Sequence, residues 1–135
     1  MTSAEQAFAA VKDTVTQEAI DAYAELSGDF NPLHVDPVAA AASEFGGIIA
    51  HGPIALQAFF RAATGWLGVE ALPAGSEVKV TYRAPTRPGD EVGCVLRELE
   101  QRDDGRSDVV AECVLRDGTT VVSVRAILAA DATTA

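Results

Sequence analysis

The segment 53–67 is apolar around most of its circumference rather than along one stripe, and this constrains the fold more than any other feature of the chain. Its apolar residues include Ile54, Leu56, Ala58, Phe59, Phe60, Ala62, Ala63, Trp66 and Leu67. A helix that is apolar on all faces is buried inside its domain. We therefore expect a central helix that is covered on nearly all sides.

The second half of the sequence reads as strands. Segments 78–82 and 92–96 carry apolar residues at every second position, and further β-rich runs occupy 108–116 and 119–129. Turns rich in Asp, Gly and Pro separate these runs. Helices followed by strands are typical of an α+β domain, so we expect one antiparallel sheet against the central helix.

Length and composition indicate a packed domain. The 135 residues are 48% hydrophobic and 22% charged, which fits one domain spanning 1–135. No apolar stretch reaches the roughly 18 to 20 residues of a membrane helix. Residues 1–15 lack the pattern of a secretory signal, so we expect a cytoplasmic location and no membrane partner. The net charge of −10 argues against nucleic acid as a partner.

Two cysteines, Cys94 and Cys113, lie in strand-like runs without CxxC spacing and without a nearby histidine. Zinc sites and redox motifs need such spacing. We therefore expect buried structural thiols and no metal site.

The first half contains two further predicted helices. Thr14 or Thr16 can cap a helix that Gly28 ends, so that Asp29 emerges just past its C-terminus. Asp36 followed by proline predicts a short second helix over 37–45. The chemistry-bearing residues fall between these two helices.

Asp29, Asn31 and His34 lie within six residues, in a segment constrained by Gly28 and Pro32. A carboxylate and an imidazole that bracket one water can act as general base and general acid. The alternative is structural: Asp29 and Asn31 would make Asx turns, and His34 would be a packing residue.

Gly52 favours the chemical interpretation, because its N–H at the start of a buried helix can stabilise negative charge on a carbonyl oxygen. Ser27 and His51 could instead form a nucleophile and base, but no GxSxG pattern surrounds the serine. An acid–base pair with an oxyanion donor suits chemistry alpha and beta to a carbonyl.

The runs Tyr23-Ala24-Glu25-Leu26-Ser27-Gly28-Asp29-Phe30-Asn31-Pro32-Leu33-His34 and Ile49-Ala50-His51-Gly52 resemble the MaoC-like (R)-specific enoyl-CoA hydratase and 3-hydroxyacyl dehydratase family. The segment 82–90 resembles a later strand and turn of that family. The resemblance implies a hot-dog fold, in which an antiparallel sheet wraps around a long central helix. It also implies reversible hydration of trans-2-enoyl thioesters to (R)-3-hydroxyacyl thioesters, on coenzyme A or acyl carrier protein, with no cofactor.

By the same resemblance, Asp29 activates the water and His34 holds it and shares in proton delivery. Asn31 orients the loop, the Gly52 N–H binds the thioester oxygen, and Arg83 is a candidate contact to a phosphate of the carrier. The sequence departs from the family's pattern in three places. The residue after Gly52 is a proline and lacks an N–H. Phe59 and Phe60 form either a bulky wall of the acyl pocket or part of the core, and the N-terminal strand is short or lost.

Other functions in the same fold stay open from sequence. One is a non-catalytic hot-dog subunit that completes the acyl pocket of a partner chain, and another is an acyl-CoA thioesterase. Uncovered sheet edges favour self-association, so we expect a homodimer or a heteromer with a second hot-dog chain. The sequence specifies neither the acyl group nor the carrier.

Overall fold

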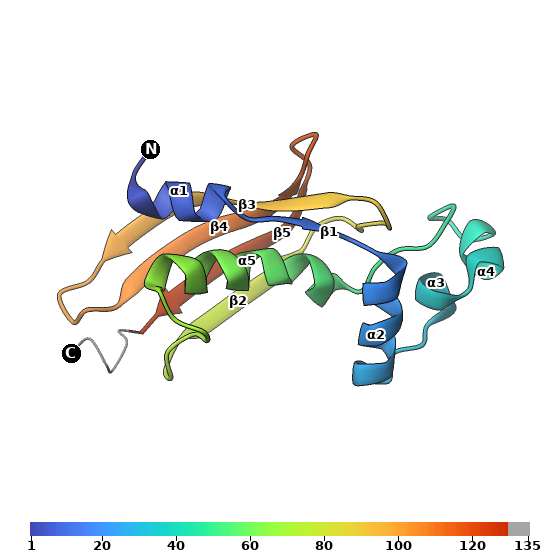
Figure 1. Ribbon diagram of the computed structural model, residues 1–135, viewed down its shortest axis with the longest axis horizontal. Helices are drawn as coiled ribbons and strands as arrows, with labels where there is room; N and C mark the ends of the chain where they lie inside the picture. Colours follow the sequence, from blue (N-terminus) through green and yellow to red (C-terminus); the bar gives the residue numbers. More distant parts are fainter. Residues whose placement is uncertain (130–135) are drawn as a thin grey trace.

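The computed structural model describes residues 1–129 and contains one five-stranded antiparallel sheet with the order β1-β3-β4-β5-β2. The strands are β1 (Lys12–Thr14), β2 (Glu77–Tyr82), β3 (Glu91–Gln101), β4 (Ser107–Leu115) and β5 (Thr120–Leu128). The long helix α5 (Gly52–Leu67) lies along one face of the sheet (Figure 1). This is the expected hot-dog fold, and the strands predicted after the central helix are confirmed. The last six residues of the expected domain, 130–135, lie outside the described residues.

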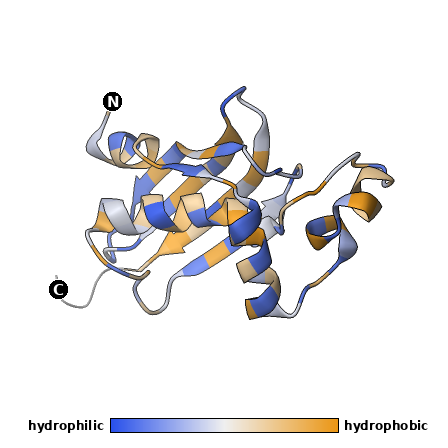
Figure 2. Ribbon diagram, turned by 45° about the vertical axis from the view of Figure 1, so that its right-hand side comes forward, coloured by the Kyte–Doolittle hydropathy of each residue, from blue (hydrophilic) through white to orange (hydrophobic). Residues whose placement is uncertain are grey.

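The core forms between α5 and the inward side chains of the strands. Hydrophobic and hydrophilic residues alternate along the strands, as a sheet with one covered face requires (Figure 2). Fully buried residues include Phe59 on α5 and Val109 and Val124 on the sheet. Phe59 packs edge-on against Phe8, at 6.3 Å between ring centroids, so of the two alternatives for Phe59 the structure shows the core.

The prediction that the central helix is buried on nearly all sides is wrong for the single chain. Gln57 and Arg61 are exposed, and Phe60 keeps 37% of its surface exposed on the same side. The sheet covers only one side of α5, whereas the apolar residues extend around more of its circumference. The face around Phe60 is therefore open in the isolated chain.

The N-terminus forms helix α1 (Ser3–Ala9), which the sequence analysis did not predict. Thr2 and Glu5 form a capping box that starts this helix. Phe8 on α1 packs against Phe59 and Trp66 of α5. The first strand is short, three residues, as expected.

Three helices lie beyond one end of the sheet: α2 (Gln17–Ser27), α3 (Pro32–Val35) and α4 (Pro37–Ala41) (Figure 1). We refer to residues 16–50 as the α2–α4 segment and to the rest of the described chain as the body. Thr16 caps α2 and Gly28 ends it in the left-handed conformation, as predicted. The helix predicted over 37–45 ends earlier, at Ala41, because the Ser43 hydroxyl donates to the Ala40 carbonyl and supports a turn instead.

Cys94 and Cys113 are buried free thiols that face each other across β3 and β4. The hydrogen bond with Cys113, together with burial, raises the pKa of the Cys94 thiol, so Cys94 stays protonated. The prediction of structural thiols agrees with this burial.

No helix within residues 1–129 is long and apolar enough to cross a membrane.

Candidate active site

Asp29 is placed by the end of helix α2. Gly28 turns the chain with φ 78°, a conformation that glycine adopts without strain. The Asp29 N–H donates to the Ser27 hydroxyl at 3.2 Å, and the Asn31 N–H donates to Asp29 Oδ1 at 3.2 Å. The carboxylate points outward from this loop and keeps 52% of its side chain exposed.

His34 is placed by the short helix α3. Asn31 caps α3 by accepting the Leu33 N–H at 3.0 Å, and Pro32 occupies its first turn. The His34 ring lies with Nδ1 2.7 Å from the carbonyl of Ile49. A carbonyl only accepts, so Nδ1 carries the hydrogen and Nε2 faces the site.

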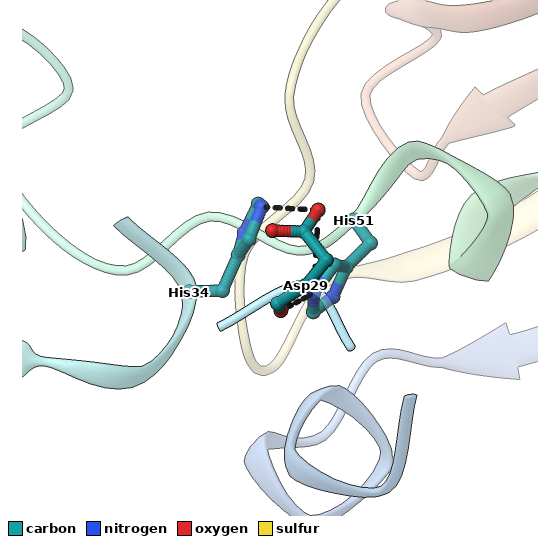
Figure 3. Close-up of side chains that lie close together, drawn as sticks. All are labelled: Asp29, His34 and His51. Atoms are coloured by element: carbon teal, nitrogen blue, oxygen red, sulfur yellow. Dashed lines mark hydrogen bonds and ion pairs between the residues drawn. The ribbon is translucent and has the colours of Figure 1, made fainter. Parts of the chain in front are cut away.

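The structure brings Asp29 and His34 together, as the sequence predicts. Asp29 Oδ2 lies 3.9 Å from His34 Nε2 (Figure 3). This separation is longer than a direct hydrogen bond and short enough for one water or substrate hydroxyl to bond to both atoms. His34 is largely buried while Asp29 is open to solvent, so a substrate can approach the pair from the carboxylate side.

His51 is a third member of the cluster that the sequence analysis missed. Its ring stacks on His34 with 3.8 Å between centroids and 28° between planes, and its Nε2 lies 2.9 Å from the Asp29 carbonyl (Figure 3). The alternative pairing of His51 as a base with Ser27 is not seen, because the Ser27 hydroxyl donates to the Tyr23 carbonyl at 2.7 Å. The sequence signal for His51 was its place directly before Gly52.

A pocket of about 420 Å³ opens beside His34 and Gly52. Most of its lining is apolar, from residues such as Ile49, Ala55 and Val122. An acyl chain fits the chemistry of such a lining. A larger groove of about 910 Å³ is lined by charged and apolar residues of β2 to β5 and contains no histidine.

Gly52 is the first residue of α5, so its N–H has no partner within the helix. A Cβ at this position would lie 2.6 Å from Cε1 of Tyr82, so any larger residue would have to displace the Tyr82 ring or the start of α5. Partial burial and the nearby Tyr23 raise the pKa of Tyr82, so its hydroxyl keeps its proton. Tyr82 is a second site residue that sequence reasoning missed, because β2 and the start of α5 meet only in the fold.

The two remaining predicted substrate contacts differ in their surroundings. Arg83 lines the pocket, and its Nε donates to the Ser123 hydroxyl at 3.1 Å. Asn31 is exposed and uses its side-chain oxygen to cap α3, and it is not among the residues that line the pocket. The geometry of Asn31 fits the loop-orienting part of its expected role.

Asp29, His34 and His51 offer ligand atoms within 4.8 Å of one another, and these are residue types that bind zinc. His51 Nε2, however, donates its hydrogen to the Asp29 carbonyl, so it has no lone pair free to bind a metal ion. Metal binding would require this arrangement to break. The geometry fits proton transfer better than metal coordination.

Comparison with known proteins agrees with the fold. The model of the MaoC like domain matches residues 2–118. The (R)-specific enoyl-CoA hydratase of Aeromonas caviae is 35% identical over 89 residues, which is 63% of this chain and 63% of the relative. A 3-hydroxyacyl-thioester dehydratase Z of Mycobacterium tuberculosis is 33% identical over 101 residues, or 73% of this chain and 67% of the relative. The matched region thus spans under two thirds of the length of the Aeromonas relative.

Solved structures show the same architecture. The (R)-hydratase from A. caviae superposes with a TM-score of 0.72 at 25% identity and covers 87% of this chain and 90% of that chain. A chain of the ChsH1-ChsH2 complex from Mycobacterium tuberculosis gives a TM-score of 0.73 at 22% identity, with 89% and 91% covered. The second likeness concerns the fold alone. On the family match and the fold together, this chain belongs to the MaoC-like domain family.

Proposed function

We propose that the protein catalyses the reversible addition of water to trans-2-enoyl thioesters, giving (R)-3-hydroxyacyl thioesters. The observation that carries this proposal is the 3.9 Å separation of Asp29 Oδ2 and His34 Nε2, beside a mostly apolar pocket. A single water can bridge two such groups, and a general base and acid on one water suit hydration. Sequence similarity to hydratases and dehydratases supports the same reaction class.

In the hydration direction, the Asp29 carboxylate accepts a proton from water, and the water oxygen bonds to C3 of the enoyl group. The electron pair of the double bond moves through C2 onto the thioester oxygen. The Asp29–His34 pair then delivers a proton to C2, which restores the carbonyl and returns the pair to its starting state. Both additions come from the side of the substrate that faces the pair, and dehydration is the reverse sequence.

The enolate oxygen needs a hydrogen-bond donor, and the Gly52 N–H is well suited to this role. It lies in the positive first turn of α5 and beside the acyl pocket. Pro53 offers no second N–H, so the main chain supplies a single donor at this point. Arg83, at the same pocket, is proposed to contact a phosphate of the carrier.

We further propose that two copies associate. Strands β1 and β2 end the sheet, so within residues 1–129 each leaves one edge unpaired, and the face around Phe60 is open. A homodimer is the simplest arrangement, and a heteromer with another hot-dog chain would cover the same surfaces. Light scattering after size exclusion tests this association: a monomer at micromolar concentration would contradict it.

A cytoplasmic location stays a prediction.

The activity is tested by incubating purified protein with a series of trans-2-enoyl-CoA substrates from crotonyl-CoA upward and identifying the product enantiomer. We expect the (R)-3-hydroxy product, with a chain-length limit set by the pocket of about 420 Å³. Asp29→Asn should abolish the reaction, and Asp21→Asn, an exposed aspartate on α2, is the matched control.

Two results would contradict the proposed function. Release of free thiol without water addition would indicate a thioesterase. Activity that appears only when a second hot-dog chain is added, and that survives Asp29→Asn, would indicate a non-catalytic subunit.

A further inference from the structure

We propose that His51 is a positioning residue that holds both members of the acid–base pair without touching the substrate. This inference rests on the proposed function and adds a residue to its machinery. The His51 side chain is almost fully buried and stacks on the ring of His34, which lines the pocket. Any effect of His51 on the reaction therefore passes through the residues it contacts.

Within residues 1–129, His51 has a buried nitrogen without a hydrogen-bond partner, which is an energetic cost that a residue used only for packing would avoid. Its side chain is 2% exposed, against 11% for His34 and 52% for Asp29. Nε2 donates to the Asp29 carbonyl, but Nδ1 is buried and has no hydrogen-bond partner among the described residues. A buried unpaired nitrogen destabilises a fold, and an apolar ring of similar size would avoid that cost. A histidine at this position is better explained by the site than by the core.

The first contact fixes the main chain of Asp29. The other hydrogen bonds of Asp29 within the described residues go to Ser27 and Asn31, which belong to the same loop. His51 is 22 residues away at the start of α5, so its bond ties the loop to the body of the fold. Without this bond, Gly28 would let the loop and its carboxylate move relative to His34.

The second contact fixes the plane of the His34 ring. The hydrogen bond to Ile49 holds one edge of the ring but allows the ring to tilt about that bond. Stacking on His51 at 3.8 Å limits this tilt. Tyr23 contacts His51 as well, with centroids 4.7 Å apart, and so holds the His51 ring in place.

Two substitutions separate these contacts. His51→Gln keeps a donor at about the position of Nε2 and removes the ring, whereas His51→Phe keeps the ring and removes the donor. We expect His51→Phe to lower kcat about 100-fold, because small displacements of catalytic groups cost this much. His51→Gln should lower kcat about 10-fold, and KM should change less than about threefold in both, because His51 makes no substrate contact.

Thermal unfolding distinguishes a positioning role from a structural one, because only a positioning role predicts a loss of activity without a loss of stability. His51→Phe should keep a melting temperature close to that of the wild type while it loses activity, because removal of a buried unpaired nitrogen offsets the loss of the hydrogen bond to the Asp29 carbonyl. An unchanged kcat in His51→Phe, a change confined to KM, or a fall in kcat that follows a fall in melting temperature would overturn the proposal.

An NMR measurement tests the positioning without activity, so that it is independent of the proposed hydratase function. Amide signals of residues 29–31 and the Cε1–H signal of His34 should broaden or shift in His51→Phe, and the amide signals should stay close to wild type in His51→Gln. Unchanged spectra in His51→Phe would refute the positioning role even if the wild type hydrates enoyl-CoA. A wild type that hydrates no thioester, with the expected spectral changes, would refute the proposed function alone.

Discussion

In the body of the fold, Phe8, Phe59 and Val124 are almost completely buried, whereas in the α2–α4 segment the large side chains Leu26 and Phe30 are exposed. The body is held by a continuous apolar core between α5 and the sheet. The α2–α4 segment contributes Ile20 to that core, and its loops are held by polar contacts such as the bond between His34 and the Ile49 carbonyl. Substitutions in the body should therefore affect stability first, and substitutions in the site should affect activity first.

The largest stability effect is expected from Phe59→Ala, which leaves a cavity between α1 and α5. Truncating a buried phenylalanine costs about 3–5 kcal/mol of unfolding free energy. Denaturant unfolding measures this cost, and Phe60→Ala, at the neighbouring exposed position, is the matched comparison: its cost should stay below about 1 kcal/mol in the isolated chain and rise where the proposed second copy covers Phe60. An equal cost for both would show that Phe60 is covered in solution, for example by a second copy.

Gly52→Ala tests the junction between the body and the site. The added methyl would lie 2.6 Å from the Tyr82 ring, so the ring or the start of α5 must shift. We expect kcat/KM to fall about 100-fold, which is the usual scale for disturbing an oxyanion donor. Gly65→Ala, on the same helix with nothing within 4 Å, should leave activity unchanged. Equal activity in both variants would contradict the role of Gly52.

Asp36→Ala tests how independent the α2–α4 segment is. Asp36 caps α4 by accepting the N–H groups of Val38 and Ala39. Losing this cap should cost about 1 kcal/mol of local stability. Hydrogen exchange should speed up in α4 and stay unchanged in the sheet, and Asp36→Asn should retain most of the protection. Faster exchange throughout the sheet would show that the two regions unfold as one unit.

The smallest effect concerns pH and the outer face of the sheet. The Thr120 hydroxyl donates to Glu112, and Arg97 pairs with it, so the pKa of Glu112 is lowered from 4.5. A carboxyl whose pKa is lower when folded adds stability above its unfolded pKa, and this stability is lost as the pH falls through the folded value. Glu112→Gln should therefore lose slightly more stability at pH 7 than at pH 3. The control Glu98→Gln, which lacks such partners in the described chain, should show a smaller difference between the two pH values.

Features that are set by residues close together in the sequence, such as the loop around Asp29 and the strands, could be predicted from the sequence. Gly28 and Pro32 constrain a short loop, so the proximity of Asp29 and His34 followed from spacing. Alternation predicted the strands, because period-two patterns report directly on a half-buried sheet. The prediction that the central helix is covered on nearly all sides was wrong. An apolar face on a helix shows that the face is covered, but it does not show whether the same chain or a second chain covers it.

The contacts of His51 and Tyr82 could not be predicted in the same way. His51 reaches Asp29 across 22 residues, and its stacking on His34 depends on where α5 begins relative to the loop. Tyr82 meets Gly52 only because the end of β2 lies beside the start of α5 in the fold. These contacts join separate elements, and no periodic pattern in the sequence reports them.

The central claim is that Asp29 and His34 act together as one proton-transfer unit. The most direct test is kcat/KM for one enoyl-CoA with Asp29→Asn, His34→Asn and the double variant, where His34→Asn keeps a donor to the Ile49 carbonyl. Each single variant should lose about 1000-fold, and the double variant should lie within about threefold of the worse single variant, because groups that act as a unit are not additive. Losses that multiply, or a single variant that keeps more than about a tenth of wild-type activity, would contradict the account.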